Sequence, residues 1–146
     1  MQLTLFSDYT LRTLMYLGAH PGQVVPASAI SEAYGTSSDH MAKAAKWLTQ
    51  RGYVTAQRGK TGGLLLARDP HTICVGALLR ETEPRLDLVE CFDREHNTCP
   101  IAPTCKLKNA LYQAREAFFA VLDGYTLADL LTNRDQLVPL LRHARA

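Results

Sequence analysis

Three cysteines stand close together in the second half of the chain. Cys91, Cys99 and Cys105 fall within fifteen residues, whereas Cys74 lies apart in an apolar stretch. A reducing compartment keeps thiols unpaired, so clustered thiols in an intracellular protein suit metal or redox chemistry better than disulfides. Cys74 is expected to be a small buried residue on the apolar face of a helix. The cysteine pattern therefore predicts a thiolate-bound metal centre.

The spacing of the three thiols leaves more than one metal open. Structural zinc sites usually combine short cysteine pairs with a fourth ligand, and His96 is a candidate for that fourth position. Iron–sulfur clusters are held mainly by thiolates at wider and more variable spacings. Three thiolates then leave one coordination position to another kind of residue. Three ordinary free thiols are the remaining interpretation, and the crowding argues against it.

The segments around the cysteines must position them. A helix is expected from Thr72 to just before Pro84, an irregular segment with three prolines over 84–104, and a long helix from Cys105 to about Leu122. Apolar residues in the long helix are spaced four and three apart, which is a heptad pattern: Leu107, Leu111, Ala114, Phe118 and Val121. This pattern predicts pairing with a second copy, or packing of the stripe on the rest of the chain. Two short helices are expected after Thr126 and Asn133.

The N-terminal half predicts a winged helix-turn-helix. A first helix is expected from Ser7 to about Leu17, and two short helices joined by Gly35-Thr36 follow it. The recognition helix begins near Ser37 or Ser38 and ends at Gln50, before Gly52. A β-prone segment, a glycine-rich turn over 58–63 and a return over 64–66 form the wing.

The charge distribution suits contact between this half and a polyanion. Residues 1–68 carry seven Lys/Arg against three Asp/Glu, while residues 69–146 carry nine against eleven. A solvated helix face would give the same count. Asp39 is expected to act as a charge at the helix N-terminus, and Trp47 and Leu48 are expected in the core. The predicted DNA contacts are Ser37, Ser38, His40, Lys43 and Lys46 on the recognition helix, with Arg58 and Lys60 on the wing.

Composition excludes several other classes of protein. The chain has 146 residues, of which 47% are hydrophobic and 21% charged, as expected for one packed protein. No apolar run approaches the roughly 18 residues that would cross a membrane, and the first residues make a poor secretion signal, so a cytoplasmic location is expected. We find no catalytic or nucleotide-binding motif and expect no enzyme. An iron–sulfur or thiol enzyme would need an acid–base pair that is not found beside the thiols.

Several stretches together resemble a known family. They are LTLFSDYTLRTLMYL, AISEAYGTSSDHMAKAAKWLTQRGYV, RGKTGGLLLA, TEPRLDLVECF, CPIAPTCKL and YTLADLL. They resemble the NsrR family, the nitric-oxide-sensing repressors of the Rrf-two superfamily of bacterial winged-helix regulators, over about residues 1–132. The resemblance implies a mainly α fold with a small β-hairpin wing. The expected parts are a winged helix-turn-helix domain (1–70), a linker helix and cluster-binding loop (71–104), a dimerisation helix (105–125) and C-terminal helices (126–146).

The resemblance also implies a site and a mechanism. Each subunit of a homodimer is expected to hold an iron–sulfur cluster through Cys91, Cys99 and Cys105, with Asp8 of the partner subunit as the fourth ligand. Asp8 favours a 4Fe-4S cluster over the alternative 2Fe-2S cluster. The dimer would bind palindromic double-stranded operator DNA and release it when nitric oxide nitrosylates the cluster. The alternatives are a regulator that senses redox or cluster status and a zinc-stabilised DNA-binding module.

Overall fold

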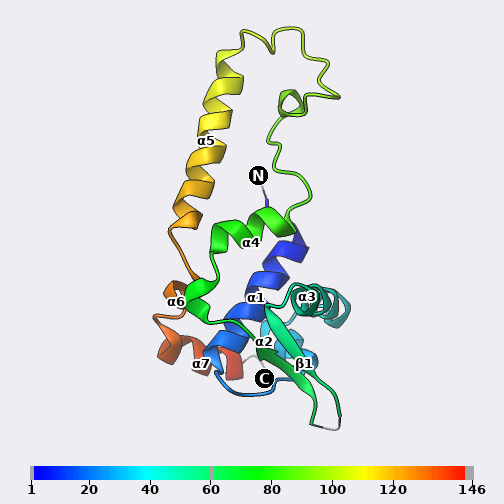
Figure 1. Ribbon diagram of the computed structural model, residues 1–146, viewed down its shortest axis with the longest axis vertical. Coiled ribbons are helices and arrows are strands. Elements are labelled where there is room, and N and C mark those ends of the chain that lie inside the picture. Colours follow the sequence, from blue (N-terminus) through cyan, green and yellow to red (C-terminus); the bar gives the residue numbers. More distant parts are fainter. Residues whose placement is uncertain (1, 60, 144–146) are drawn as a thin grey trace.

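The computed structural model describes residues 2–59 and 61–143 (Figure 1). Lys60, one of the predicted DNA contacts, and residues 144–146 of the predicted C-terminal segment lie outside the described residues. The helices are α1 (Leu5–Ala19), α2 (Ala27–Tyr34), α3 (Ser38–Gln50), α4 (Val75–Thr82), α5 (Lys106–Asp123), α6 (Leu127–Leu130) and α7 (Arg134–His143). The strands β1 (Val54–Gln57) and β2 (Gly63–Leu66) pair antiparallel, and two short 3-10 turns are η1 (Pro70–Thr72) and η2 (Glu90–Phe92).

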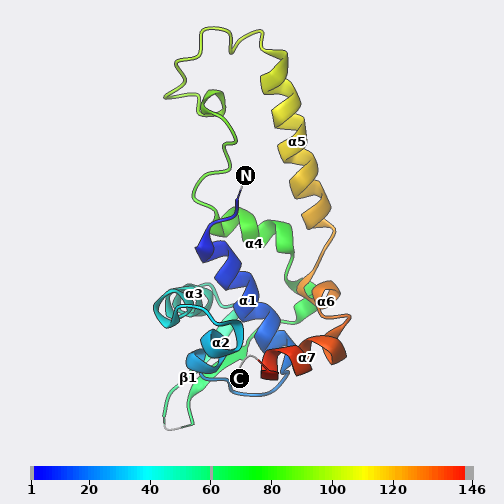
Figure 2. The same ribbon diagram turned by 180° about the vertical axis from the view of Figure 1, so that it is seen from behind.

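The elements form a body and an arm (Figures 1 and 2). The body contains the helix-turn-helix, the hairpin, α4, α6 and α7, while α5 and the loop over 84–104 extend away from it. The main core lies between α1, α2 and α3, where fully buried side chains meet: Leu14, Leu17, Ile30, Met41 and Leu48. The mainly helical fold with a hairpin wing agrees with the sequence prediction. No helix in the described part of the chain is long and apolar enough to cross a membrane.

Helix α1 begins earlier than the sequence prediction placed it. Thr4, not Ser7, is the N-cap, and its hydroxyl accepts a hydrogen bond from the Ser7 N–H at 3.2 Å. The side chain of Ser7 is fully buried and bonds to α4 instead. The prediction failed because either residue can cap a helix, and only the contact with α4 decides between them.

The turn of the helix-turn-helix has the predicted geometry. Gly35 ends α2 with a φ of 60°, in the left-handed region that favours glycine, and the Thr36 N–H then donates to the Ser31 carbonyl. In the wing, Val54 lies opposite Leu66 and Gln57 opposite Gly63. A Cβ at Gly63 would lie 2.6 Å from the Val25 backbone, so glycine lets the wing pack closely on the segment before α2.

The prediction for Cys74 is wrong. Cys74 is the extended N-cap residue of α4 and only half-buried, and it forms an isolated β-bridge with Thr126. Its Sγ lies 3.7 Å from the Asp123 carbonyl oxygen. Helix α4 starts at Val75 rather than Thr72 because Asp69 caps a separate 3-10 turn over Pro70–Thr72. Cys74 therefore lies where α4 meets the end of α5.

The apolar stripe of α5 is only partly covered within one chain. Leu107 is 66% exposed and Val121 61% exposed, and Ala114 is also exposed. The buried residue of this helix is Phe119, which packs on α4 through Val75 and Leu79. Leu111 and Phe118 of the stripe are half-buried, and Phe118 packs on the same cluster as Leu3 and Leu11. The stripe is therefore covered in part by its own chain, and its exposed part is free to pair with a second copy.

Candidate metal centre and nucleic-acid interface

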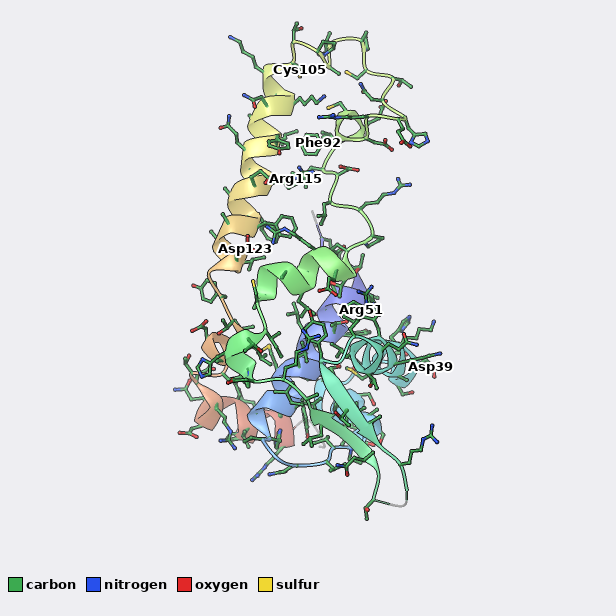
Figure 3. All side chains as sticks on the ribbon, in the orientation of Figure 1. Asp39, Arg51, Phe92, Cys105, Arg115 and Asp123 are labelled. Atoms are coloured by element: carbon green, nitrogen blue, oxygen red, sulfur yellow. The ribbon has the colours of Figure 1, made fainter. Side chains whose placement is uncertain are left out.

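The three clustered cysteines lie along the arm. Cys91 is in the turn η2, Cys99 is in the loop, and Cys105 is the N-cap of α5, at its outer tip (Figure 3). The Cys105 sulfur accepts a hydrogen bond from the Lys108 N–H at 3.4 Å. All three are half-buried free thiols. The N-terminus of α5 thus directs backbone N–H groups toward one of the sulfurs, which suits a negatively charged thiolate ligand.

A carboxylate clamp joins the two ends of the loop segment between the first two cysteines. The Glu90 Oε1 accepts hydrogen bonds from the Thr98 N–H at 2.6 Å and from the Thr98 hydroxyl at 2.7 Å. These bonds lower the pKa of Glu90 from its ordinary value. Glu90 precedes Cys91 and Thr98 precedes Cys99, so the clamp draws together the backbone next to the two thiols.

A second carboxylate organises the middle of the same loop. The Asp93 Oδ1 accepts from the backbone N–H groups of Glu95 and His96 at 3.0 and 3.3 Å. Its Oδ2 lies 2.8 Å from the His96 Nδ1, and the hydrogen bond with His96 is the main cause of the lowered pKa of Asp93. The carboxylate thus engages one ring nitrogen of His96 in a local turn. Metal-bound histidines commonly make such a bond through their second ring nitrogen, so this contact does not decide whether His96 is a ligand.

Arg115 fixes the loop to α5. Its guanidinium carbon lies 4.9 Å from the ring centre of Phe92 and 4.8 Å from that of Tyr112, and its Nη1 donates to the Leu86 carbonyl at 3.4 Å. Figure 3 shows Arg115 and Phe92 in the space between α5 and the loop. Since Phe92 follows Cys91 directly, this contact positions the first thiol relative to the helix that Cys105 caps.

Asp8 lies in the body of the molecule, on α1. It forms an ion pair with Arg12, whose guanidinium also lies over the Tyr34 ring at 5.4 Å. Burial raises the pKa of Tyr34 to about 12, so this phenol stays neutral. Cys105 stands at the tip of the arm, well removed from α1 along the long axis (Figures 1 and 3). One chain thus keeps Asp8 apart from Cys105.

The chemical types of the candidate ligands suit an iron–sulfur cluster. Three free, half-buried thiols on a clamped loop supply soft sulfur ligands, and one carboxylate could complete the set from elsewhere. Over residues 2–59 and 61–143, no three His, Cys, Asp or Glu side chains lie close enough together to hold a metal ion. The single chain therefore presents the ligands without gathering them at one point.

The predicted DNA contacts that the structure describes are all exposed. Ser37 is the N-cap of α3 and its hydroxyl makes no capping hydrogen bond. Asp39 is in the first turn of α3 and points away from the body (Figure 3). Leu48 is fully buried as predicted, whereas Trp47 is only half-buried. The exposed side chains are those of Ser37, Ser38, His40, Lys43 and Lys46 on or beside α3, and Arg58 on the wing.

Sequence reasoning missed the residues that shape the loop. Glu90, Thr98 and Arg115 are common polar residues, and no motif distinguishes them from solvated ones. The available signal was position alone, since Glu90 and Thr98 each precede a cysteine. Their pairing depends on the fold of the loop, which hydrophobic periodicity does not predict.

Comparison with known proteins places these features in context. The family model Rrf2, described as an iron-dependent transcriptional regulator, matches residues 3–133. The chain is 43% identical over 143 residues to the HTH-type transcriptional regulator NsrR of Bacillus subtilis (strain 168), covering 97% of this chain and 98% of that protein. It is 44% identical over 146 residues to the protein of the same name from Geobacillus kaustophilus (strain HTA426), covering 99% of each.

Solved structures are similar over most of the chain. The structure of T. potens IscR matches with a TM-score of 0.72 at 26% sequence identity, covering 91% of this chain and 88% of that one. CymR, the global cysteine regulator of B. subtilis, matches with a TM-score of 0.73 at 23% identity, covering 91% and 98%. The relatives are named as regulators of transcription rather than as enzymes, in agreement with the absence of catalytic motifs.

Proposed function

Since the chain belongs to the Rrf2 family of transcriptional regulators (the Rrf-two superfamily), we propose that it is a dimeric repressor whose affinity for operator DNA depends on an iron–sulfur cluster and falls on exposure to nitric oxide. The observation that carries the proposal is the clamped loop of the arm. Glu90, Asp93 and Arg115 hold the loop that carries Cys91 and Cys99, and Cys105 caps the N-terminus of the long helix that follows. A cytoplasmic location follows from this role.

The cluster is proposed to bind between two subunits. Cys91, Cys99 and Cys105 supply three sulfur ligands, and Asp8 of the partner subunit supplies the fourth ligand. The carboxylate favours a 4Fe-4S cluster, with 2Fe-2S as the alternative. When bound, the cluster supplies iron atoms that react with nitric oxide. The position of Asp8 in the body, away from the tip of its own arm, supports a ligand supplied from the second copy.

The dimer is proposed to form along α5. Its exposed stripe has the four-three spacing that pairs helices side by side, and Leu107 and Val121 would lose their exposure on pairing. Burial of such apolar surface contributes about 25 cal/mol per Å². The arm of one copy would then reach toward the body of the other.

The recognition helix is proposed to enter the major groove of DNA. Ser37, Ser38, His40 and Lys43 are near its N-terminus and would contact base edges or phosphates, while Lys46 would contact a phosphate. Arg58 and Lys60 on the wing would reach the minor groove. In a dimer the two recognition helices serve half-sites about 34 Å apart, so their separation decides the affinity.

Asp8 couples the two functions. While its carboxylate is bound to the partner's arm, α1 is fixed, and α1 packs directly on α3. Loss of that bond frees α1 and with it the relative placement of the two recognition helices. Affinity for DNA then falls although no DNA-contacting residue has changed, which is a linkage between two distinct sites.

Purification without oxygen tests the proposal. We expect a brown protein that contains iron and sulfide, and that binds a palindromic duplex selected from a random pool more tightly before nitric oxide treatment than after it. Bound zinc without iron would instead support the zinc-stabilised module. A protein free of iron, or one that binds the selected duplex equally well with and without its cluster, would overturn the proposal. A response to oxidants but not to nitric oxide would identify a redox sensor.

A further inference from the structure

The last residues of α4 hold the start of α1. The Glu83 Oε1 accepts hydrogen bonds from the Thr4 N–H at 2.9 Å and from the Thr4 hydroxyl at 3.2 Å. The Thr82 hydroxyl oxygen accepts from the Ser7 hydroxyl at 2.8 Å, and both side chains are buried. Ser7 immediately precedes Asp8. The position of the proposed ligand is therefore set by Thr82, the last residue of α4, and by the C-cap residue Glu83.

The preceding residue of α4, Glu81, contacts the segment between the recognition helix and the wing. The Tyr53 hydroxyl donates to the Glu81 Oε1 at 3.1 Å, and the Arg51 Nη1 lies 3.6 Å from the Glu81 Oε2. Arg51 is the C-cap of α3, and Tyr53 stands directly before strand β1. Figure 3 shows Arg51 between α3 and α4. Glu81 thus contacts the point where the recognition helix passes into the wing.

Arg68 makes this point rigid. Its side chain donates to the carbonyl oxygens of Arg51 and Gly52 at 2.6 and 3.0 Å, and its guanidinium lies 3.9 Å from the centre of the Tyr53 ring. Tyr53 is itself 5% exposed, and its N–H donates to the Leu48 carbonyl. A displacement of Tyr53 would therefore move the end of α3 and the base of the wing together.

A ring contact runs parallel to these hydrogen bonds. Trp47 stacks on Tyr53 with ring centres 6.1 Å apart and meets Phe6 of α1 edge-on at 5.8 Å. Phe6 lies two residues before Asp8, and Trp47 follows Lys46. Trp47 is the single tryptophan of the chain, so its fluorescence reports on the contact between α1 and α3.

We propose that Glu81, Thr82 and Glu83, which we term the coupling joint, transmit the state of Asp8 to the recognition helix and the wing. The proposal rests on the proposed function, because it assumes that Asp8 changes partner when the cluster is lost. The joint holds the start of α1 with two residues and the end of α3 with the third. Glu81 and Thr82 lie in the last turn of α4, and Glu83 is its C-cap. A shift of α1 is therefore expected to displace the end of α4 and, through Glu81, the end of α3. The three are positioning residues and contact neither DNA nor cluster.

Two conservative variants separate the sides of the joint. Thr82→Val removes the acceptor of the buried Ser7 hydroxyl, and Tyr53→Phe removes the donor to Glu81. For each we would measure the ratio of affinities for the selected duplex between cluster-loaded and cluster-free protein. Loss of one such hydrogen bond is expected to lower that ratio about fivefold. Thr10→Val, which removes a buried hydroxyl that bonds within α1, and Tyr125→Phe are the matched controls and should keep the wild-type ratio.

Trp47 emission provides a readout of the joint that does not depend on DNA. The emission maximum of the wild type should differ between loaded and cluster-free protein. In Thr82→Val this difference should become smaller, and the direct contact between Phe6 and Trp47 accounts for what remains. Loaded Asp8→Ala should emit like the cluster-free wild type, which excludes absorption by the cluster as the cause. Variants that melt earlier but keep both the affinity ratio and the emission difference would show a merely structural role and overturn the proposal.

The outcomes distinguish the joint from the proposed function. If the wild type binds DNA equally with and without the cluster, the proposed function fails and the joint fails with it. If the wild type depends strongly on its cluster while Thr82→Val and Tyr53→Phe keep the full dependence, only the coupling joint is wrong.

Discussion

Asp8 is paired with Arg12 one turn along the same helix, with the Arg12 Nη2 2.9 Å from one carboxylate oxygen and the Nε 3.0 Å from the other. The side chains of Arg12 and Asp8 are 37% and 36% exposed, so the pair lies at the surface. Exposed pairs of this kind contribute at most about 1 kcal/mol. Arg12 therefore orients the Asp8 carboxylate. Exchange of this ion pair for a bond to a metal would cost little free energy.

We predict that Asp8→Ala separates cluster binding from DNA binding. Three thiols remain, so anaerobically purified protein should still contain iron and sulfide, but its affinity for operator DNA should no longer change with the cluster. Arg12→Gln, which keeps the carboxylate, is the control and should retain the dependence. Gel-shift titrations of both loaded variants measure this. An Asp8→Ala protein that responds to nitric oxide as the wild type does would contradict the assigned role of Asp8.

The clamp between Glu90 and Thr98 should open in acid. Because the pKa of Glu90 in the folded protein is below its ordinary value of 4.5, the clamp stabilises the loop fully above that value. This stabilisation is lost as the pH falls through the lowered folded-state pKa. We therefore expect the Thr98 amide of cluster-free protein to exchange its hydrogen faster in that range, after correction for the intrinsic exchange rate.

Glu90→Gln should remove this pH dependence, because the amide oxygen can still accept a hydrogen bond but does not titrate. The His96 amide serves as an internal control, since its acceptor is Asp93, whose pKa is also lowered and which remains in the variant. Exchange at Thr98 that still follows pH in Glu90→Gln would assign the effect to another group.

The regular elements were predictable because local chemistry determines them. Gly35 and Gly52 both adopt positive φ at the predicted ends of α2 and α3, and Thr126 caps α6 with a full capping box. These signals act within four residues of the chain. The predictions for the start of α1 and for the position of Cys74 were wrong because contacts between residues distant in the sequence determine both. Ser7 bonds to Thr82, and Cys74 pairs with Thr126.

The candidate site was predictable only in its ligands. Thiols and basic side chains are identified by residue type, but the clamp at Glu90 and the contacts of Arg115 require the tertiary arrangement of a loop without periodicity. The coupling joint shows the same limit. Glu81, Thr82 and Glu83 lie at the end of a predicted helix, and their partners are 28 to 79 residues away in the sequence.

The stripe on α5 predicts a variant that separates subunits without unfolding them. Ala114 is exposed in the single chain and lies at the centre of the heptad pattern, so Ala114→Glu should leave the melting of the body unchanged. In a dimer it would bring two like charges into an apolar contact and should weaken association at least about tenfold. Gln113→Glu adds the same charge beside the seam and should not. Sedimentation equilibrium would measure the dimer dissociation constants of the two variants. Equal constants would show that α5 does not form the dimer interface.

Lys46 should contribute to DNA affinity through a phosphate rather than a base. It is exposed one turn beyond Lys43 on α3, on the side of the helix opposite to the buried Leu48. Loss of one phosphate contact per subunit should weaken binding to all sequences alike and reduce the slope of log affinity against log salt by about 1 for each contact. We would titrate Lys46→Ala against the selected duplex and an unrelated one over a range of salt concentrations, with Lys106→Ala on α5 as the control of equal charge change. If Lys46→Ala alters the preference between the two duplexes while the salt slope stays at the wild-type value, Lys46 reads a base edge, and the recognition helix lies deeper in the groove than proposed.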